Sequence, residues 1–214
     1  MPKLKYTDIR KYLRFYAVTD PGWTAKLSLK EQVDAALQGG VSMVQLREKT
    51  LPQAAFLHKA VELKKLTDQF NVPLIINDNL EIAIQSNAAG LHIGQNDGSI
   101  TEIRQSLGPD KILGVSTQTV EQALYAEAAG ADYLGVGAIF PTNTKNDAEI
   151  VSLETLSAIC RAVKIPVVAI GGINEQNIPS ILPYGIAGVA LVSAIFAAQN
   201  ITENCRKIDK LLNI

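Results

Sequence analysis

The sequence predicts an α/β protein with the architecture of a single-domain (β/α)8, or TIM, barrel. Three observations support this prediction. Eight short apolar runs begin about every 25 residues along the chain. The segments between them repeat apolar residues with the period of an amphipathic helix. Several runs end abruptly in polar residues, as expected where a site is assembled at the carboxyl ends of barrel strands. A doubly wound open sheet is the alternative, but the even spacing favours the barrel.

The predicted elements follow a short N-terminal extension, residues 1–14, which we expect to be helical from Thr7-Asp8 onward. The barrel domain is predicted to span residues 15–214. Its near-continuous apolar runs are typical of parallel strands that are buried on both faces. The expected strands are Phe15–Thr19, Ser42–Leu46, Pro73–Ile76, Gly90–Ile93, Ile112–Val115, Tyr133–Phe140, Pro166–Ile170 and Gly188–Val192.

Glycines at several junctions between a helix and the next strand support these boundaries. They are Gly39-Gly40, Gly90, Gly130 and Gly185. A helix commonly ends in a residue with left-handed backbone, and glycine adopts that conformation most readily. We therefore expect left-handed backbone at these junctions.

The composition excludes several classes of partner. The 214 residues are 47% hydrophobic and 19% charged, with a formal net charge of -1. A surface without a basic excess has no general attraction for nucleic acid or an anionic membrane, and no apolar stretch reaches the roughly 18 residues of a membrane span. Cys160 and Cys205 have no metal-ligand spacing, so free thiols in a reducing compartment, the cytoplasm, are expected. The oligomeric state is open, and a homo-oligomer is compatible with the sequence.

The sixth run changes character most sharply. Tyr133–Phe140 is apolar, and Pro141 is expected to end the strand. Hydroxyls, amides and one cation follow, which are groups that proteins use to hold phosphate oxygens. They come from the run of Thr142, Asn143, Thr144, Lys145, Asn146 and Asp147. A solvated connection is the plain alternative, but the other strands also end in polar residues, and together these ends would line one pocket.

The second strand alternates polar and apolar residues at its end. Gln45, Arg47 and Lys49 share one face, and Val44 and Leu46 share the other. In a barrel, the apolar face packs against helices, while the polar face points into the mouth. A salt-bridged strand end is the alternative, although it does not explain a pair of inward cations.

Carboxylates follow the third and fourth strands, in Asn77-Asp78 and in Asn96-Asp97. Adjacent strands lie roughly 4.8 Å apart, so both acids can reach one small cation. A site with oxygen ligands and no His/Cys pair favours Mg²⁺ that keeps several waters. Plain ion pairs with the nearby cations fit the spacing equally well. His92, inside an apolar run, is interpreted as a hydrogen-bonded core residue.

The remaining strand ends suggest a second anion site. The fifth strand is followed by Ser116-Thr117, which is either a hydroxyl contact or a helix cap. The seventh stops at Gly171-Gly172, and the eighth at Ser193-Ala194. Glycine lets backbone N–H groups approach an anion closely, and the ends of strands seven and eight often bind phosphate in this fold. A glycine-lined pocket suits a monophosphate, whereas the cations and a metal suit a diphosphate.

In combination, these residues resemble the thiamine-phosphate synthase family. The resemblance runs from Tyr16 to Ala194, nearly the whole chain. It rests on seven motifs in order, which are VQLREK (44–49), IND (76–78), GLHIGQND (90–97), GVST (114–117), GAIFPTNTKNDA (137–148), VVAIGGI (167–173) and GVALVSAI (188–195). The family joins a hydroxymethylpyrimidine diphosphate to a thiazole phosphate, and it releases diphosphate.

The resemblance implies a role for each matching residue. The pyrimidine diphosphate would contact Gln45, Leu46, Arg47, Glu48, Lys49, Asn77, Ser116 and Lys145. The thiazole phosphate would contact Thr142, Asn143, Thr144, Gly172, Val192 and Ser193. One Mg²⁺ would be bound by Asp78 and Asp97. The expected catalytic residues are Arg47, Lys49, Lys145 and Ser116, and the expected reaction is dissociative, without a protein nucleophile.

Two alternatives stay open. A thiazole tautomerase on the same barrel would need only the monophosphate site, and it is expected to use a histidine shortly after strand five. Gln118 lies in that neighbourhood, which departs from many synthases too but counts more against the tautomerase. A non-catalytic phosphate-binding barrel would have no use for the paired acids Asp78 and Asp97.

Overall fold

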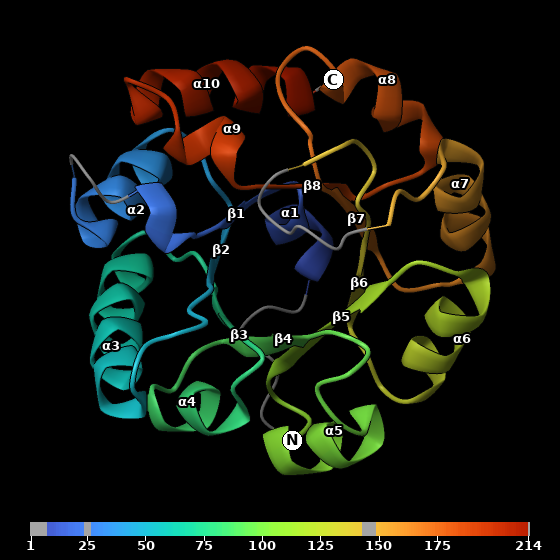
Figure 1. The fold of residues 1–214 in the computed structure, drawn as a ribbon, viewed down its shortest axis with the longest axis horizontal. Helices are drawn as coiled ribbons and strands as arrows, with labels where there is room; N and C mark the ends of the chain where they lie inside the picture. Colours follow the sequence, from blue (N-terminus) through green and yellow to red (C-terminus); the bar gives the residue numbers. More distant parts are fainter. Residues whose placement is uncertain (1–7, 24–26, 143–148, 214) are drawn as a thin grey trace.

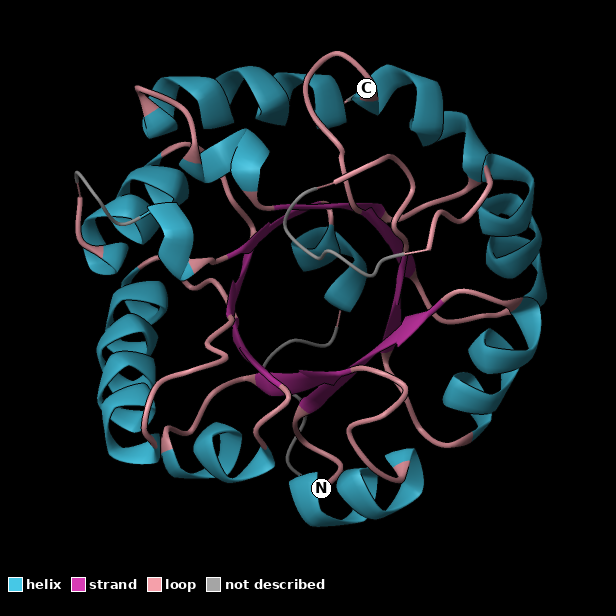
Figure 2. Cartoon of the chain, viewed as in Figure 1, coloured by secondary structure: helices cyan, strands magenta, loops and turns pink. Residues whose placement is uncertain are grey.

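The eight strands form one closed parallel barrel, and they pair in the order of the sequence. The computed structural model describes residues 8–23, 27–142 and 149–213. Figure 2 shows the strands as a ring with most of the helices outside it. The structure confirms the predicted barrel and excludes the open doubly wound sheet. No helix within the described ranges is long and apolar enough to cross a membrane.

Strands and helices largely alternate along the chain, and the helices that follow the first strand surround the barrel (Figure 1). The strands are β1 (Phe15–Val18), β2 (Met43–Leu46), β3 (Leu74–Asn77), β4 (Gly90–Ile93), β5 (Ile112–Thr117), β6 (Tyr133–Val136), β7 (Val167–Ile170) and β8 (Gly188–Leu191). The helices are α1 (Ile9–Leu13), α2 (Leu29–Gln38), α3 (Gln53–Gln69), α4 (Leu80–Gln85), α5 (Ile100–Leu107), α6 (Val120–Ala128), α7 (Leu153–Ala162), α8 (Ile178–Ile181), α9 (Ser193–Phe196) and α10 (Ile201–Leu212), with 3-10 turns η1 (Pro21–Trp23) and η2 (Leu182–Tyr184).

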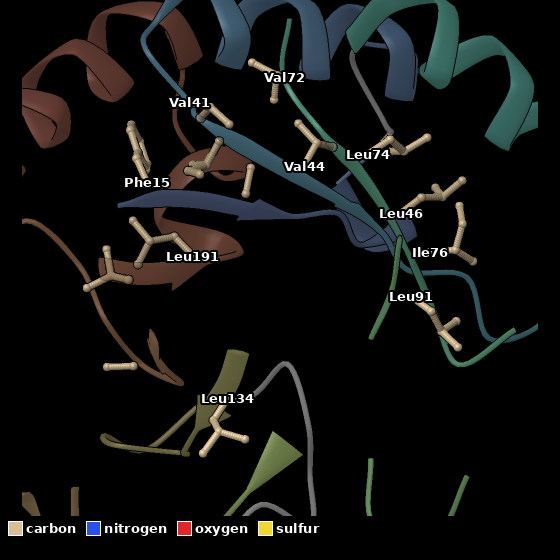
Figure 3. Close-up of a cluster of buried hydrophobic side chains, with 14 of the residues drawn as sticks. Phe15, Val41, Val44, Leu46, Val72, Leu74, Ile76, Leu91, Leu134 and Leu191 are labelled. Atoms are coloured by element: carbon tan, nitrogen blue, oxygen red, sulfur yellow. The ribbon is translucent and has the colours of Figure 1, made fainter. Parts of the chain in front are cut away.

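Alternate strand residues face the two sides of the barrel wall, as the period of a strand requires. Outward residues such as Val44 and Leu46 pack with the helices in the larger apolar core, part of which Figure 3 shows. Inward residues such as Tyr16 and Met43 form a second, smaller cluster inside the barrel. Every strand except β4 therefore contributes to two separate cores, and the inner core supports the floor of the barrel mouth.

Helix α1 belongs to the inner core. Its Leu13 is fully buried in the inner cluster, and Ile9 and Tyr12 pack against that cluster. Seen along the barrel axis, α1 lies within the ring of strands (Figure 1). The helix begins close to the predicted Thr7-Asp8, and because it precedes β1 it covers the amino-terminal end of the barrel. The helical part of the predicted extension thus packs into the barrel interior.

Two strands differ from their predicted lengths by more than one residue. β6 ends at Val136 and not at Phe140. The Gly137–Ala138 peptide bond is cis, and the amide of Ala138 donates to the carbonyl of Glu149, far along the chain. β5 extends to Thr117, so Ser116 lies within the strand, and the helix cap is Thr119. The apolar residues after Val136 therefore made the predicted β6 too long, and the polar residues after Val115 made the predicted β5 too short.

The glycine prediction was right at three junctions and wrong at one. Gly40, Gly130 and Gly185 have φ values of 102°, 99° and 88°. Gly90 is the first residue of β4, and the left-handed residue of that junction is Asn87, with φ 52°. Position 90 favours glycine for a steric reason, because a Cβ atom there would lie 2.1 Å from the carbonyl oxygen of Ile112 on β5.

Candidate active site

A cavity of about 560 Å³ opens at the carboxyl ends of the strands. Most of the residues predicted for the site line it, and they come from β2 to β8 and the loops that follow. These residues are Gln45, Arg47, Lys49, Asn77, Asp78, Asp97, Ser116, Thr142, Gly172, Val192 and Ser193. The predicted Asn143, Thr144 and Lys145 lie outside the described residues. The strand ends thus meet in one mouth, as the sequence predicts.

The cations that follow β2 are held by acids from neighbouring strands. The Arg47 guanidinium donates to Asp20 Oδ2 at 3.2 Å, and the Arg47 backbone amide donates to Thr19 Oγ1 at 3.0 Å. Lys49 forms an ion pair with Asp78. The sequence left two alternatives for this strand end, which were cations that point into the mouth and cations held in salt bridges. The structure shows both features at once.

Leu46 and Glu48 do not present their side chains to the cavity. Leu46 is fully buried in the outer core. The Glu48 side chain is 2% exposed and accepts from Lys59 Nζ on α3 at 2.6 Å. Strand alternation turns both side chains away from the mouth, and the contact of these two residues with substrate stays a prediction. Only their backbone is left to contribute there.

We expect Lys59→Met to lower the free energy of unfolding by about 1–3 kcal/mol, because the change leaves the buried Glu48 carboxylate without its cation. The expected loss is discounted for the partial exposure of Lys59. Urea unfolding measures it, and Lys59→Met/Glu48→Gln is the matched control, which should recover much of the stability. A double variant as unstable as the single one would contradict this role for the pair.

The two carboxylates that follow β3 and β4 face the same part of the cavity. Burial raises the pKa of Asp78, and the Asp97 carboxylate raises it further, against the opposing effect of Lys49. Asp97 also accepts from the Gly94 amide at 2.6 Å. Among the described residues no group of three or more Asp, Glu, His or Cys side chains is arranged so that it could hold a metal ion. The donor set thus fits a hard cation held by two carboxylates, with waters and ligand oxygens completing its coordination.

A chain of hydrogen bonds crosses the floor of the cavity. His92 Nε2 lies 2.9 Å from Ser116 Oγ, and His92 Nδ1 lies 2.9 Å from the Tyr133 hydroxyl. Tyr133 and Tyr16 join their hydroxyls at 2.9 Å, and Gln45 Nε2 donates to Tyr16 at 2.8 Å. Burial lowers the pKa of His92 to about 4, so the imidazole is neutral at neutral pH. The interpretation of His92 as a hydrogen-bonded core residue is confirmed.

The sequence analysis did not identify Tyr16 and Tyr133, the two tyrosines of this hydrogen-bond chain, as parts of the site. Burial raises the pKa of both Tyr16 and Tyr133, so their hydroxyls stay protonated. The available signal was two tyrosines at inward positions of otherwise apolar strands, since a buried hydroxyl needs a partner.

The opposite side of the mouth is lined by glycine and backbone. Gly171 and Gly172 have φ values of 98° and 62°. A Cβ atom on Gly172 would lie 2.5 Å from the carbonyl oxygen of Pro141, so the backbones of the loops after β6 and β7 pack directly together. Ser193, the first residue of α9, lines the cavity beside them. Gln118 also lines the cavity, and its backbone amide donates to Gln122.

The closed barrel, with its polar mouth at the carboxyl ends of the strands, defines a TIM-barrel enzyme. Residues 15–195 match the family described as thiamine monophosphate synthase. The chain belongs to this family, whose members are transferases.

The sequences of known relatives match this chain over almost its full length. The chain is 48% identical to the thiamine-phosphate synthase of Clostridium tetani, over 92% of this chain and 95% of that protein. It is 46% identical to thiamine-phosphate synthase 2 of Streptococcus pneumoniae, over 96% and 98% of the two chains. The solved structure of thiamine phosphate pyrophosphorylase from Pyrococcus furiosus has a TM-score of 0.88 at 33% identity, over 96% of this chain and 98% of that one.

Proposed function

We propose that the protein joins 4-amino-2-methyl-5-(diphosphooxymethyl)pyrimidine to 4-methyl-5-(2-phosphooxyethyl)thiazole. The products are thiamine phosphate and diphosphate. Family membership supports the overall reaction. The single observation that carries the assignment of the site is the division of the mouth, with cations and paired acids after β2 to β4 and glycine-lined backbone after β7.

The pyrimidine diphosphate is assigned to the charged side of the mouth. Its proposed partners are Gln45, Arg47, Lys49, Asn77, Ser116 and Lys145, with backbone contacts from 46 and 48. Asp78 and Asp97 would hold Mg²⁺, which when bound would stabilise the negative charge of the departing diphosphate. Arg47 and Lys49 would exchange Asp20 and Asp78 for diphosphate oxygens. Their charge is thereby placed where negative charge grows as the C–O bond breaks.

The thiazole phosphate is assigned to the glycine-lined side. Thr142, Asn143, Thr144, Gly172, Val192 and Ser193 are the proposed contacts, with backbone N–H groups supplying part of the binding. The thiazole nitrogen then faces the pyrimidine methylene carbon. The C–O bond to diphosphate breaks first, the methylene cation is captured by the nitrogen, and a C–N bond forms. No side chain acts as a nucleophile, so the protein contributes position and charge.

Two observations favour this proposal over its competitors. A tautomerase needs a proton-transfer group where Gln118 lines the cavity, and an amide does not titrate there. A binding protein gains nothing from two facing carboxylates, where burial and then the neighbouring Asp97 raise the pKa of Asp78. The free Cys160 and Cys205 are consistent with a cytoplasmic reaction.

The direct test measures diphosphate release by the purified protein, with each substrate alone and with both, in the presence and absence of Mg²⁺. We expect release that requires both substrates and the metal. Isomerised thiazole phosphate without diphosphate would assign the tautomerase, and ligand binding without either product would assign the binding protein.

A further inference from the structure

The hydrogen-bond chain on the cavity floor joins two walls of the mouth that are far apart in the barrel order. Gln45 stands on β2 and Ser116 on β5, and both line the cavity. Tyr133, which connects the two halves of the chain, is fully buried and is not among the described residues that line the cavity. It therefore reaches a ligand only through its neighbours.

Glycines in the barrel wall leave room for the rings of this hydrogen-bond chain. A Cβ atom on Gly114 would lie 2.1 Å from Tyr133 Cζ, and one on Gly135 would lie 3.1 Å from His92 Cε1. The Tyr16 and Tyr133 rings meet edge to face, with centroids 6.0 Å apart and planes at 70°. Glycines on β5 and β6 thus admit rings that carry polar atoms into an apolar interior.

The direction of the chain follows from its first member. Gln45 Nε2 can only donate, so the Tyr16 oxygen accepts. Tyr16 as a whole residue is 1% exposed, and among the described residues the other partner of its hydroxyl is the Tyr133 oxygen. A buried proton without an acceptor is unfavourable, so Tyr16 donates to Tyr133.

The same rule carries the direction onward. Tyr133, having accepted from Tyr16, donates its single proton to His92 Nδ1. The neutral imidazole then carries its proton on Nε2 and donates to Ser116 Oγ. Because Ser116 accepts from His92, its own proton is free to point into the cavity.

We propose that Tyr133 is a positioning residue whose hydroxyl carries the direction of these hydrogen bonds from Tyr16 to His92, so that Ser116 meets the substrate as a hydrogen-bond donor. The ligand group would be an acceptor of the pyrimidine diphosphate, either a ring nitrogen or a diphosphate oxygen. The identity of this ligand rests on the proposed function, whereas the direction of the hydrogen bonds does not.

The direction is tested without substrate by nitrogen NMR of the two histidines, His58 and His92, at neutral pH. We expect His92 to carry its proton on Nε2 and to have a proton-free Nδ1. In Tyr133→Phe the Nδ1 resonance should move, while the resonances of His58 on α3 stay in place. A proton on Nδ1 of the unmodified protein would reverse the chain and overturn the proposal.

The consequence for the reaction is tested with a double-mutant cycle. Tyr133→Phe should lower kcat on the order of tenfold, as expected for the loss of one orienting hydrogen bond, and leave KM for the thiazole phosphate unchanged. Tyr125→Phe, which removes the same atom from a side chain exposed on α6, is the matched control.

Ser116→Ala already lacks the donor, so adding Tyr133→Phe to it should cost little more activity. Fully additive losses would show that Tyr133 does not act through Ser116. If the unmodified protein released no diphosphate, the proposed function would fail, while the NMR result would still decide the direction of the chain.

Discussion

Asp78→Ala is expected to lower the rate of diphosphate release by about a hundredfold or more at a Mg²⁺ concentration that saturates the unmodified enzyme. Removing one well-placed electrostatic group from an active site commonly costs 10²–10³ in kcat. Here the change removes one of two carboxylates proposed to hold the cation, and it also removes the ion-pair partner of Lys49. The measurement is the initial rate as a function of Mg²⁺ concentration.

Asp110→Ala is the matched control for this experiment. Asp110 is exposed and precedes β5, at the opposite end of the barrel from the cavity. It should leave the rate and the Mg²⁺ dependence as they are. An Asp78→Ala enzyme that retained both would remove Asp78 from the proposed metal site.

Gly90→Ala should lower the free energy of unfolding by at least about 3 kcal/mol, at the upper end of the usual cost of overpacking. The added Cβ would lie 2.1 Å from the carbonyl oxygen of Ile112 and 2.7 Å from its Cβ. Gly90 and Ile112 are paired across β4 and β5, so neither can move without disturbing the barrel register. Urea unfolding measures the change.

Gly108→Ala separates this clash from the general cost of replacing glycine. A Cβ on Gly108 would meet nothing within 4 Å, although its φ of 82° is unfavourable for alanine. We expect a loss of about 1–3 kcal/mol there from the backbone alone, because φ 82° with ψ 167° is a conformation essentially restricted to glycine. Equal losses in the two variants would show that the wall between β4 and β5 can relax around the extra methyl group.

The barrel could be predicted because its signal is local and repeated. Each strand is an apolar run and each helix has its own period, so eight similar units indicate one architecture. Element ends were harder to predict. Ala138 and Phe140 are as apolar as strand residues, but their amides bond to Glu149 and Gly171 and not along a continued ladder. Where a strand ends therefore depends on backbone groups that are distant in the sequence.

The site residues, like the strands, could be predicted where the signal is local in the sequence and not where it depends on distant contacts. Strand alternation correctly placed Gln45, Arg47 and Lys49 at the mouth. Glu48 was assigned to substrate because it lies within a motif, but the partner of its side chain is Lys59 on α3. The chain through Tyr16 and Tyr133 joins residues 117 positions apart, and no period in the sequence reports a contact across a barrel floor.

The ion pair between Lys49 and Asp78 has a thermodynamic consequence if the proposed site is correct. The metal needs the carboxylate of this pair, and the diphosphate needs its ammonium group. Whichever arrives first separates the two side chains, and the second then finds its partner already released. The pair has to be broken once and not twice, so each ligand raises the affinity for the other, by the same factor in both directions. Lys49 and Asp78 would thus link metal and diphosphate binding before the two ligands touch one another.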